Sequence, residues 1–356
     1  MVQKQYKRDA IPAEPLISRH VFLDTQVYRS LGHSSTNRAM ELLKSQIEAH
    51  HIVLHTTDIT LMEIQRQIRE RVLTRQRELK DTQKDLSHWR KVAPKLLPKH
   101  FDFDAEELSA RLYTKFLNFL LHECKLKSHR ALLIKPSIIF KRYFDRKPPF
   151  DGENSKEFPD GFVVEALLAW CQKNVQQIYV VTEDKAFLRA VNNERSLTPL
   201  KNIHDLLARA STDLGSEGEL AAETALNGQN FDESLTSTLS AAVPNLAFVY
   251  TGDLADGEAY GGEFISIEEI NDWTVVGLNE ISVSVILTIK LIAQVEVQYE
   301  DLEHAIYDKE DGRWFGAETT STEITSEIEI EMVAEIDRGN GSIIDSDIIT
   351  HEVRVQ

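Results

Sequence analysis

The first 210 residues alternate short apolar runs with longer segments whose apolar residues recur every three or four positions. The short runs have the length of buried strands, and the longer segments have the period of amphipathic helices. The predicted strands are residues 20–25, 52–55, 177–182 and 196–201. The predicted helices are residues 34–50, 56–80, 162–173, 183–191 and 203–210. This alternation of strands and helices predicts a parallel sheet flanked by helices, in an α/β layer fold.

A highly charged segment at about 66–150 interrupts this alternation. Its pattern is mostly helical, with breaks at Pro94 and Pro98, so we interpret it as a helical insert. Several aromatic residues lie within it. Tyr113 and Phe116, together with Leu120, have helical spacing, and we expect them to pack inward rather than to stack on bases.

The pattern changes again after residue 210. Residues 211–243 are rich in Ser, Thr, Gly, Glu and Asp, and we predict a linker with at most short helices. From residue 244 the period becomes two, which predicts an antiparallel β-domain over 244–356, with two sheets packed as a sandwich. The inward positions on one predicted strand are Ile324, Ile328, Ile330 and Met332, and the outward positions are Glu327, Glu329 and Glu331. We therefore expect two domains, 1–210 and 244–356.

Charge is distributed unevenly between the two parts. The net charge of the 356-residue chain is −17, which alone argues against nucleic-acid binding. However, residues 1–150 contain 28 Lys and Arg against 17 Asp and Glu, and the rest of the chain contains 12 against 40. The basic part is suited to holding a polyanion, although a solvated helical face explains it equally well. The acidic β-domain would repel nucleic acid, so we expect it to bind a protein partner or to form a homo-oligomer.

The composition also excludes several kinds of site and location. Cys124 and Cys171 are too few and too far apart for a disulfide framework or a paired-cysteine metal site, which favours a reducing cytoplasm. The longest apolar run, 281–293, is too short to span a membrane and contains Lys290. The first residues lack the apolar core of a secretory signal. Phosphate-binding loops, dinucleotide-binding glycine motifs and serine-nucleophile motifs are absent from the sequence.

Four acidic residues lie at the ends of predicted elements in the first domain. Asp24 ends the first strand, Glu63 lies early in the helix after the second strand, and Asp184 follows the third strand. Asp160 begins the helix that follows the insert. Because the carboxyl ends of parallel strands meet at one edge of a sheet, these side chains are expected to converge.

Converging carboxylates repel one another, and a hard divalent cation such as Mg²⁺ or Mn²⁺ relieves that repulsion. Such an ion can activate a water molecule and stabilise negative charge on a phosphodiester. Taken singly, each acid also has a purely structural explanation. Asp24, Asp160 and Asp184 could cap helices, and Glu63 could be one charge on an exposed helix.

Four short segments resemble the PIN domain family: FLDT, TLMEI, FPDGFVVEA and VVTEDKAFL, in that order. The resemblance covers about 18–210 and is closest to the larger bacterial PIN domains that carry a helical insert. The C-terminal domain resembles no family that we recognise. The resemblance implies that Asp24, Glu63, Asp160 and Asp184 are catalytic. It implies a metal site at the three aspartates, with Thr25 and Thr182 as supporting hydroxyl groups.

Other polar residues near these segments are candidates for supporting roles. Glu165 and Glu183 are placed to support the acidic crevice, although a solvated or ion-paired glutamate is the simpler explanation. The candidates for contact with nucleic acid are Arg66, Arg69, Lys156 and Lys185. For the arginines, spacings of three and four residues from glutamates also favour ion pairs within the helix.

The resemblance implies a metal-dependent endoribonuclease that hydrolyses single-stranded RNA with Mg²⁺ or Mn²⁺, leaving 5′-phosphate and 3′-hydroxyl ends. Bacterial relatives of this kind often act as toxins or in antiviral defence. Two alternatives stay open. One is a PIN-fold module that binds RNA or protein without catalysis, and the other is a nuclease that cleaves DNA.

Overall fold

The structure is a computed structural model, and it describes residues 14–92, 103–152, 157–302, 305–308, 313–315, 318–350 and 352–356. The chain divides into two compact units. The N-terminal unit spans Leu16–Ala210, and the C-terminal unit contains Ser211–Gln356. We describe each unit by itself.

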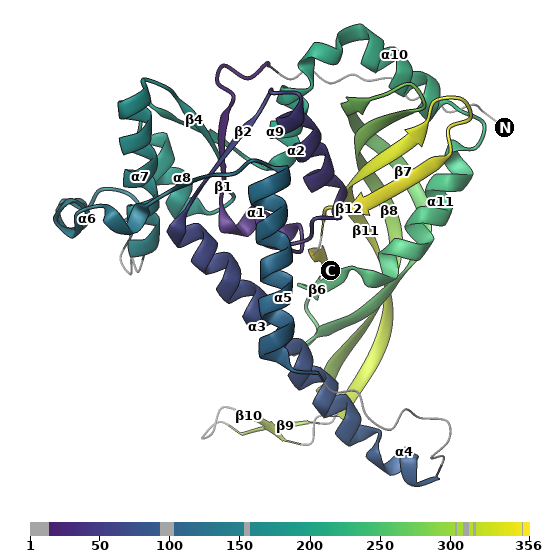
Figure 1. Cartoon of the computed structure of the whole chain (residues 1–356). Coiled ribbons are helices and arrows are strands. Elements are labelled where there is room, and N and C mark those ends of the chain that lie inside the picture. The colour runs from purple at the N-terminus through teal and green to yellow at the C-terminus, as the bar shows by residue number, and fades with distance from the viewer. Residues whose placement is uncertain are drawn as a thin grey trace. The chain divides into compact units, whose positions relative to one another are not determined.

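A five-stranded parallel sheet forms the centre of the N-terminal unit (Figure 1), with the order β3-β2-β1-β4-β5. Its strands are β1 (His20–Leu23), β2 (Val53–Thr57), β3 (Lys127–His129), β4 (Ile178–Val181) and β5 (Leu197–Leu200). Four of these overlap predicted strands, and the predicted parallel sheet is confirmed. The edge strand β3 was not predicted, because its three residues are polar and partly exposed and carry no apolar pattern.

The described part of this unit also contains helices, most of which flank the sheet. They are α1 (Thr25–Ser30), α2 (Arg38–Glu48), α3 (Asp58–Asp85), α4 (Ser87–Val92), α5 (Ala105–Asn118), α6 (Pro136–Phe144), α7 (Phe158–Asn174), α8 (Lys185–Asn192) and α9 (Ile203–Ala210). On one face of the sheet, Phe22 and Val180 pack in an apolar cluster with residues of α7 and α8 such as Leu167 and Phe187. The central strands β1 and β4 are buried along their whole length, as expected when helices cover both faces.

Within the insert, α3 and α5 lie side by side (Figure 1). Arg69 of α3 forms an ion pair of 2.5 Å with Glu106 of α5. Phe116 and Leu120 are buried and Tyr113 is partly buried, so the predicted inward packing is confirmed. The prolines at 94 and 98 lie outside the described residues.

The C-terminal unit contains a four-stranded antiparallel sheet with the order β12-β11-β8-β7. Its strands are β7 (Glu258–Leu278), β8 (Ser282–Asp301), β11 (Glu318–Asp337) and β12 (Ile343–Ile348). Alternate residues of β8 from Val283 to Val297 are buried in one apolar cluster, as the period of two predicts. The same cluster contains Ile328, Ile330 and Met332, with Ile324 packed partly against it.

Residues 211–243, which we expected to form a linker, instead form two helices of 12 residues each, α10 (Gly215–Leu226) and α11 (Phe231–Ala242). Small residues such as Ala222 and Ala225, with Phe231 and Leu235, bury one side of these helices in the core of the C-terminal unit. The apolar side is easy to miss in the sequence because serine, threonine and glutamate surround the small residues.

The expected sandwich of two full sheets is also corrected. The core face of the four-stranded sheet is covered by α10 and α11 and by a short parallel pair, β6 (Ala247–Tyr250) with β13 (Glu352–Val355). Two further short strands, β9 (Ile306–Asp308) and β10 (Arg313–Phe315), pair with each other. Alternation of apolar and polar residues indicates that one face of a sheet is buried, but it does not indicate whether helices or strands cover that face.

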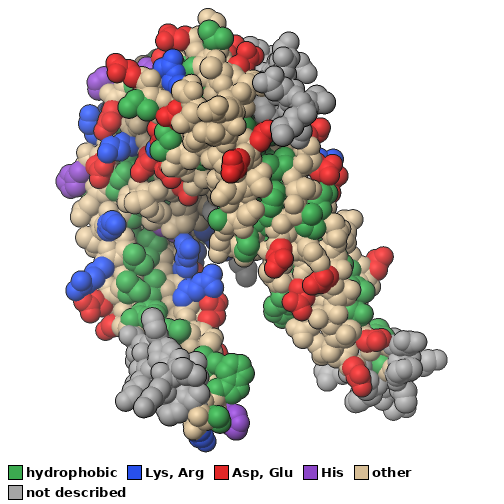
Figure 2. All heavy atoms as spheres, turned by 90° about the vertical axis from the view of Figure 1, so that its right-hand side faces the viewer, with side chains coloured by type: hydrophobic (Ala, Val, Ile, Leu, Met, Phe, Trp, Pro, Cys, Tyr) green, Lys and Arg blue, Asp and Glu red, His purple; other side chains and the backbone are tan. Residues whose placement is uncertain are grey.

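The other face of the long strands is rich in carboxylates. Figure 2 shows Asp and Glu side chains on the visible face of these strands. The outward glutamates Glu327 and Glu329 are exposed as predicted, and Glu331 is half-buried. Over the described parts of the chain, no helix combines the length and apolar character that crossing a bilayer requires.

Candidate functional site

The candidate site lies where three neighbouring strands, β2, β1 and β4, reach their carboxyl ends. The chain turns from β1 towards β2 and β3 on one side, and later towards β4 and β5 on the other, so the order reverses between β1 and β4. Parallel α/β sheets form a ligand crevice at such a reversal. The backbone N–H of Asp24 donates to the carbonyl of Val181 at 3.0 Å, which joins the two strand ends at this point.

Asp24 is held in place by hydroxyl and backbone donors. Its Oδ1 accepts from the backbone N–H of Thr25 at 2.6 Å and from the Thr25 hydroxyl at 3.3 Å. Its Oδ2 accepts from the buried Thr182 hydroxyl at 2.7 Å. Burial raises the pKa of Asp24, and the nearby carboxylate of Asp184 raises it further against the effect of these hydrogen bonds. Asp24 therefore serves as N-cap of α1 and faces a second carboxylate.

Asp160 has the most strongly perturbed carboxyl group of the site. Burial, followed by the charges of Asp24, Glu157 and Glu63, raises the pKa of Asp160 to about 8. It occupies the first turn of α7, whose N-cap is Glu157, so it is not the helix cap that its position after Pro159 suggested. Without a cation, this carboxyl group holds a proton near neutral pH.

Glu63 lies in the second turn of α3 and is half-buried. Burial and then the charge of Asp24 raise the pKa of Glu63, while Arg66 and the Thr25 hydroxyl lower it. Thr57 fixes the start of this helix as its N-cap, because its hydroxyl accepts from the Thr60 N–H at 3.1 Å.

Asp184 follows β4 and caps α8. Its Oδ1 accepts from the backbone N–H of Phe187 at 2.7 Å. Its own N–H donates to the Thr182 hydroxyl at 3.1 Å, so Thr182 links Asp24 and Asp184 through one oxygen. The four acids thus come together from β1, α3, α7 and the end of β4, and the electrostatic effects above connect each of them to at least one other.

The four acidic side chains at this edge suit a hard divalent cation, because carboxylates are the ligands that Mg²⁺ and Mn²⁺ prefer. In addition, the pKa values of at least three of them are raised, so that their charged forms are disfavoured without a cation. Even so, among the residues that the structure describes, no three His, Cys, Asp or Glu side chains form a ready-made metal cage. Both oxygens of Asp24 face hydroxyl groups, and one oxygen of Asp184 faces a helix N-terminus. Side-chain rotation would be needed to bring three oxygens to the distance of about 2.1 Å at which Mg²⁺ binds.

The two glutamates considered as supports lie differently. Glu165 forms an ion pair with the buried Arg142, which also pairs with Glu194. This matches the simpler explanation of Glu165, that of an ion-paired side chain. Glu183 is exposed, between Asp184 and the buried Thr182.

The basic residues expected to contact nucleic acid differ in whether an ion pair already holds their charge. Arg69 is bound to Glu106 and holds α5 against α3, so its charge is already partnered. Arg66 is exposed, lies 3.8 Å from Glu70, and is near enough to Glu63 to lower its pKa. Lys185 is exposed at the first position of α8. Lys156 lies outside the described residues.

Sequence reasoning missed Glu157, which lies close enough to Asp160 to raise its pKa by charge and through a hydrogen bond. Its spacing of three residues from Asp160 across a helix start was the available signal. Gly161 was also overlooked. A Cβ at this position would lie 2.7 Å from the Phe150 ring, so only glycine lets this turn of α7 approach the insert so closely.

Fold and site together define an α/β unit with a group of carboxylates at a strand reversal, of the kind that suits divalent-cation chemistry. Comparison with known families agrees with this. Residues 21–187 match the PIN domain family, and the N-terminal unit is therefore a PIN domain. PIN domains form a superfamily of nucleases that typically depend on divalent metal ions. No family matches in the C-terminal region, and neither a search of curated proteins nor one of solved structures gave a match.

Proposed function

We propose that this chain is a metal-dependent endoribonuclease that hydrolyses single-stranded RNA. The observation that carries the proposal is the convergence of Asp24, Glu63 and Asp160, each with a raised pKa, at the strand reversal of a PIN domain. Clustered carboxylates repel one another, and a bound cation offsets this repulsion. Such a cluster with raised pKa values is therefore a candidate for a functional metal site. An acidic crevice would otherwise repel a polyanionic substrate.

In this proposal Asp24, Asp160 and Asp184 would hold Mg²⁺ or Mn²⁺. The ion would supply an activated water and stabilise the charge that develops on the phosphodiester. Thr182 and Thr25 orient the carboxylate of Asp24 through their hydroxyl groups. Glu63, whose pKa is raised towards neutrality, is placed to accept or return a proton beside Asp24. Arg66 and Lys185 provide exposed positive charge next to these acids.

The test is an RNA cleavage assay on the full chain with Mg²⁺ or Mn²⁺. We compare the wild type with Asp24→Asn and Asp160→Asn, because asparagine removes the charge while keeping the shape and, at position 24, the capping oxygen. We expect each substitution to lower the rate by about 10²-fold or more, the scale expected when a group acting in the transition state is lost. EDTA should abolish cleavage.

The matched control is Glu329→Gln, which removes one carboxylate from the exposed sheet face of the other unit and should leave the rate unchanged. Cleavage that survives both aspartate substitutions, or that ignores EDTA, contradicts the proposal. Single-stranded DNA of the same sequence is assayed in parallel, and a preference for DNA would redirect the substrate assignment.

A second candidate function is a PIN-fold module that binds RNA or protein without cutting. It is favoured by one observation, the lack of a ready-made metal cage among the described residues. RNA binding without cleavage under every metal condition would select this reading. A titration that detects Mn²⁺ binding to the wild type but not to Asp160→Asn would argue against it.

Three broader assignments belong to this proposal. We propose a reducing cytoplasm, supported by Cys124 and Cys171, which are both free and buried. We propose that the acidic face of the C-terminal sheet binds protein, either a partner or a second copy, rather than nucleic acid. A toxin or antiviral role would follow if expression of the wild type, but not of Asp160→Asn, arrested growth of the host cell.

A further inference from the structure

A cavity of about 400 Å³ lies in the N-terminal unit between α3, α5 and the loop Gly32–Ser35 that follows α1. Its volume is in the range of sites that hold small organic groups, roughly 300–1,000 Å³. Of the described residues that line it, three are cations, Arg71, Arg75 and Lys115, and none is Asp or Glu. In an acidic chain, a hollow whose described charged lining is positive suits an anionic occupant.

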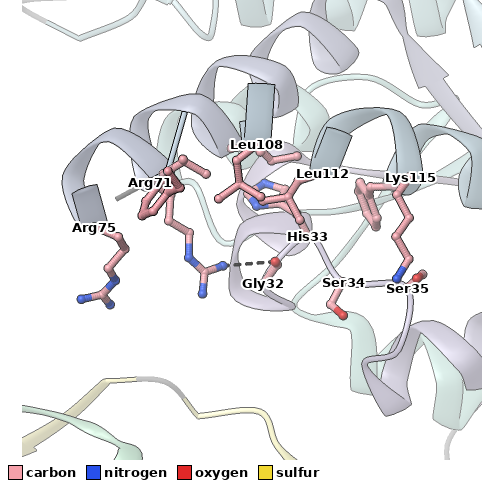
Figure 3. Close-up of a pocket in the computed structure, with 13 residues that line it drawn as sticks. Gly32, His33, Ser34, Ser35, Arg71, Arg75, Leu108, Leu112 and Lys115 are labelled. Carbon is pink, nitrogen blue, oxygen red and sulfur yellow. Dashed lines mark hydrogen bonds between the residues drawn. The ribbon is translucent and has the colours of Figure 1, made fainter. Parts of the chain in front are cut away.

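The cavity also has an apolar wall. Figure 3 shows Leu108 and Leu112 of α5 between Arg71 and Arg75 on one side and Lys115 on the other. Figure 2 likewise shows hydrophobic side chains among Lys and Arg side chains on the visible face of the segment formed by α3 and α5. Leu112 is 43% exposed, so part of this apolar wall is open to a ligand. Cations that flank an apolar surface are the arrangement that binds phosphate and base together.

The charged groups are available. Arg71 donates to the carbonyl of Gly32 at 3.1 Å, and among the described residues neither Arg71 nor Lys115 forms an ion pair with a carboxylate. Within the described residues, Arg75 pairs only with the exposed Glu78 of its own helix. The Gly32–His33 turn that presents this carbonyl has two left-handed residues, with φ of 67° and 51°. The turn therefore holds one guanidinium in place while leaving its other N–H groups for a ligand.

Two elements connect the cavity to the acidic site. The helix α1 begins beside Asp24 and leads directly into the loop of the cavity. On α3, Glu63 and Arg71 are eight residues apart, which is about 12 Å along the axis, and i, i+4, i+8 spacing puts them on the same side of the helix. Gln67, halfway between them, accepts a hydrogen bond from the ring of His33 on that loop at 3.1 Å. A strand bound at the acids and running along α3 would reach the cavity within a few nucleotides.

We propose that this cavity binds a nucleotide of the substrate strand, a few positions from the bond that is cut. Its phosphate lies at Lys115 and the two arginines, and its base lies against the leucines of α5. The inference rests on the proposed function, because it assigns a second subsite to the same strand. It goes beyond that function by naming the surface of the insert that selects longer substrates.

The test measures binding by the full chain of a fluorescent single-stranded RNA of about twelve nucleotides, in EDTA, as a function of salt. Lys115→Ala should weaken binding and reduce the slope of log K against log salt by about 0.7, the value for one lost phosphate contact on a single strand. Leu112→Ala should weaken binding by about fivefold, through lost apolar contact, without changing the slope. Both side chains are exposed, so the fold should tolerate both changes.

The matched control is Lys173→Ala, which removes an exposed lysine near the end of α7, opposite the helix end that carries Asp160. It should leave both affinity and slope unchanged. Lys115→Arg should restore the slope.

Equal binding of the long RNA by the wild type, Lys115→Ala, Leu112→Ala and the control overturns the inference, even if the wild type cleaves RNA. Adenosine monophosphate serves as the free-nucleotide probe. If Leu112→Ala weakens the binding of adenosine monophosphate but not that of the RNA strand, the cavity binds free nucleotides, and the proposal that it binds a nucleotide of the substrate strand is wrong. A wild type that binds the strand through Lys115 and Leu112 but never cuts it supports the cavity and contradicts the proposed function, so the two failures are distinguishable.

Discussion

Two regions of this chain are rich in carboxylates, and they differ in how the backbone distributes them. At the edge of the parallel sheet, four acids from separate elements converge and are partly buried. On the antiparallel sheet of the other unit, Glu327, Glu329 and Glu331 project at alternate positions from the face of β11 opposite the core. The second region has more carboxylates, but only the first is suited to a cation. Convergence and burial, rather than the number of charges, distinguish a candidate metal site from an acidic surface.

Local partners account for much of this difference. On the exposed face, Glu327 pairs with Lys290 at 2.7 Å across the strands, and Glu329 accepts from Asn271 at 2.8 Å. In the crevice, Asp160 meets the like charges of Asp24, Glu63 and Glu157 instead. An antiparallel sheet can alternate charge with amide and ammonium groups between neighbouring strands. Parallel strands bring their ends to one place, so acids located there face each other.

The largest expected effect is the response of stability to metal. Mn²⁺ at about 100 times its dissociation constant should stabilise the N-terminal unit by about 2.7 kcal/mol, which corresponds to a rise in melting temperature of several degrees. Asp160→Asn should lose most of this gain. It should also be more stable than the wild type in EDTA at neutral pH, because folding no longer requires a buried carboxyl group to hold a proton that the unfolded chain has lost. Thermal melts of both proteins in EDTA and in Mn²⁺ give all four values.

The pH dependence of stability in the absence of metal tests the same group. The pKa of Asp160 rises from its ordinary value of 3.8 to about 8, so between these pH values the folded state holds a proton that the unfolded state has lost. This group therefore makes the metal-free protein less stable as pH rises through that window. Asp160→Asn should flatten the dependence in EDTA. A dependence identical to that of the wild type would show that Asp160 is not buried among like charges, and the comparison between the two acidic regions would fail.

His55 is a second buried titratable residue in the same sheet, and it can be compared with Asp160 because its charged form is a cation rather than an anion. The His55 ring lies between His20 at 3.0 Å and His129 at 2.7 Å, on three adjacent strands. Burial, then the neighbouring histidines and Lys127, lowers the pKa of His55 from 6.5 to about 3. Convergence in a parallel sheet thus disfavours the charged form of bases as well as of acids.

The unfolded state of this histidine gains a proton as pH falls below about 6.5, and the folded state does not until about pH 3. His55 therefore removes up to about 1.4 kcal/mol of stability for each unit of acidification within that window. Urea unfolding of the wild type and of His55→Gln at pH 7 and pH 5 isolates this contribution, since the acids are the same in both proteins. We expect the variant to be less stable at pH 7 but to lose less between the two pH values. A steeper loss in the variant would contradict the assigned histidine cluster.

The sequence predicted those parts of the fold that depend on local periodicity. The apolar runs of β1, β2, β4 and β5 and the period of two in β8 and β11 were sufficient for the two sheets. It missed β3, whose pairing depends on β2 and not on its own residues. It also missed the burial of α10 and α11, because alanines surrounded by Ser, Thr and Glu become a core surface only when a sheet lies against them.

For the candidate site, strand ends predicted which acids would converge, because topology alone brings Asp24 and Asp184 together. Glu157 was missed because its proximity to Asp160 depends on where α7 begins. The cavity between α3 and α5 was not predicted either. It depends on the angle of the loop at Gly32 and on the packing of two helices, α3 and α5, that are not consecutive in the sequence, and neither feature has a periodic signal.

The smallest expected effect is on the exposed sheet. Glu327→Gln breaks the ion pair with Lys290, but both side chains are substantially exposed to screening solvent, so the free energy of unfolding should change very little. The same glutamate and its neighbours Glu268 and Glu269 raise the pKa of Lys290, and glutamine should lower it again. Mn²⁺ should stabilise this variant as much as the wild type. If instead Glu327→Gln reduced the response to Mn²⁺ as strongly as Asp160→Asn does, dispersed carboxylates would bind the ion as well as convergent ones, and the distinction between the two acidic regions would have no physical basis.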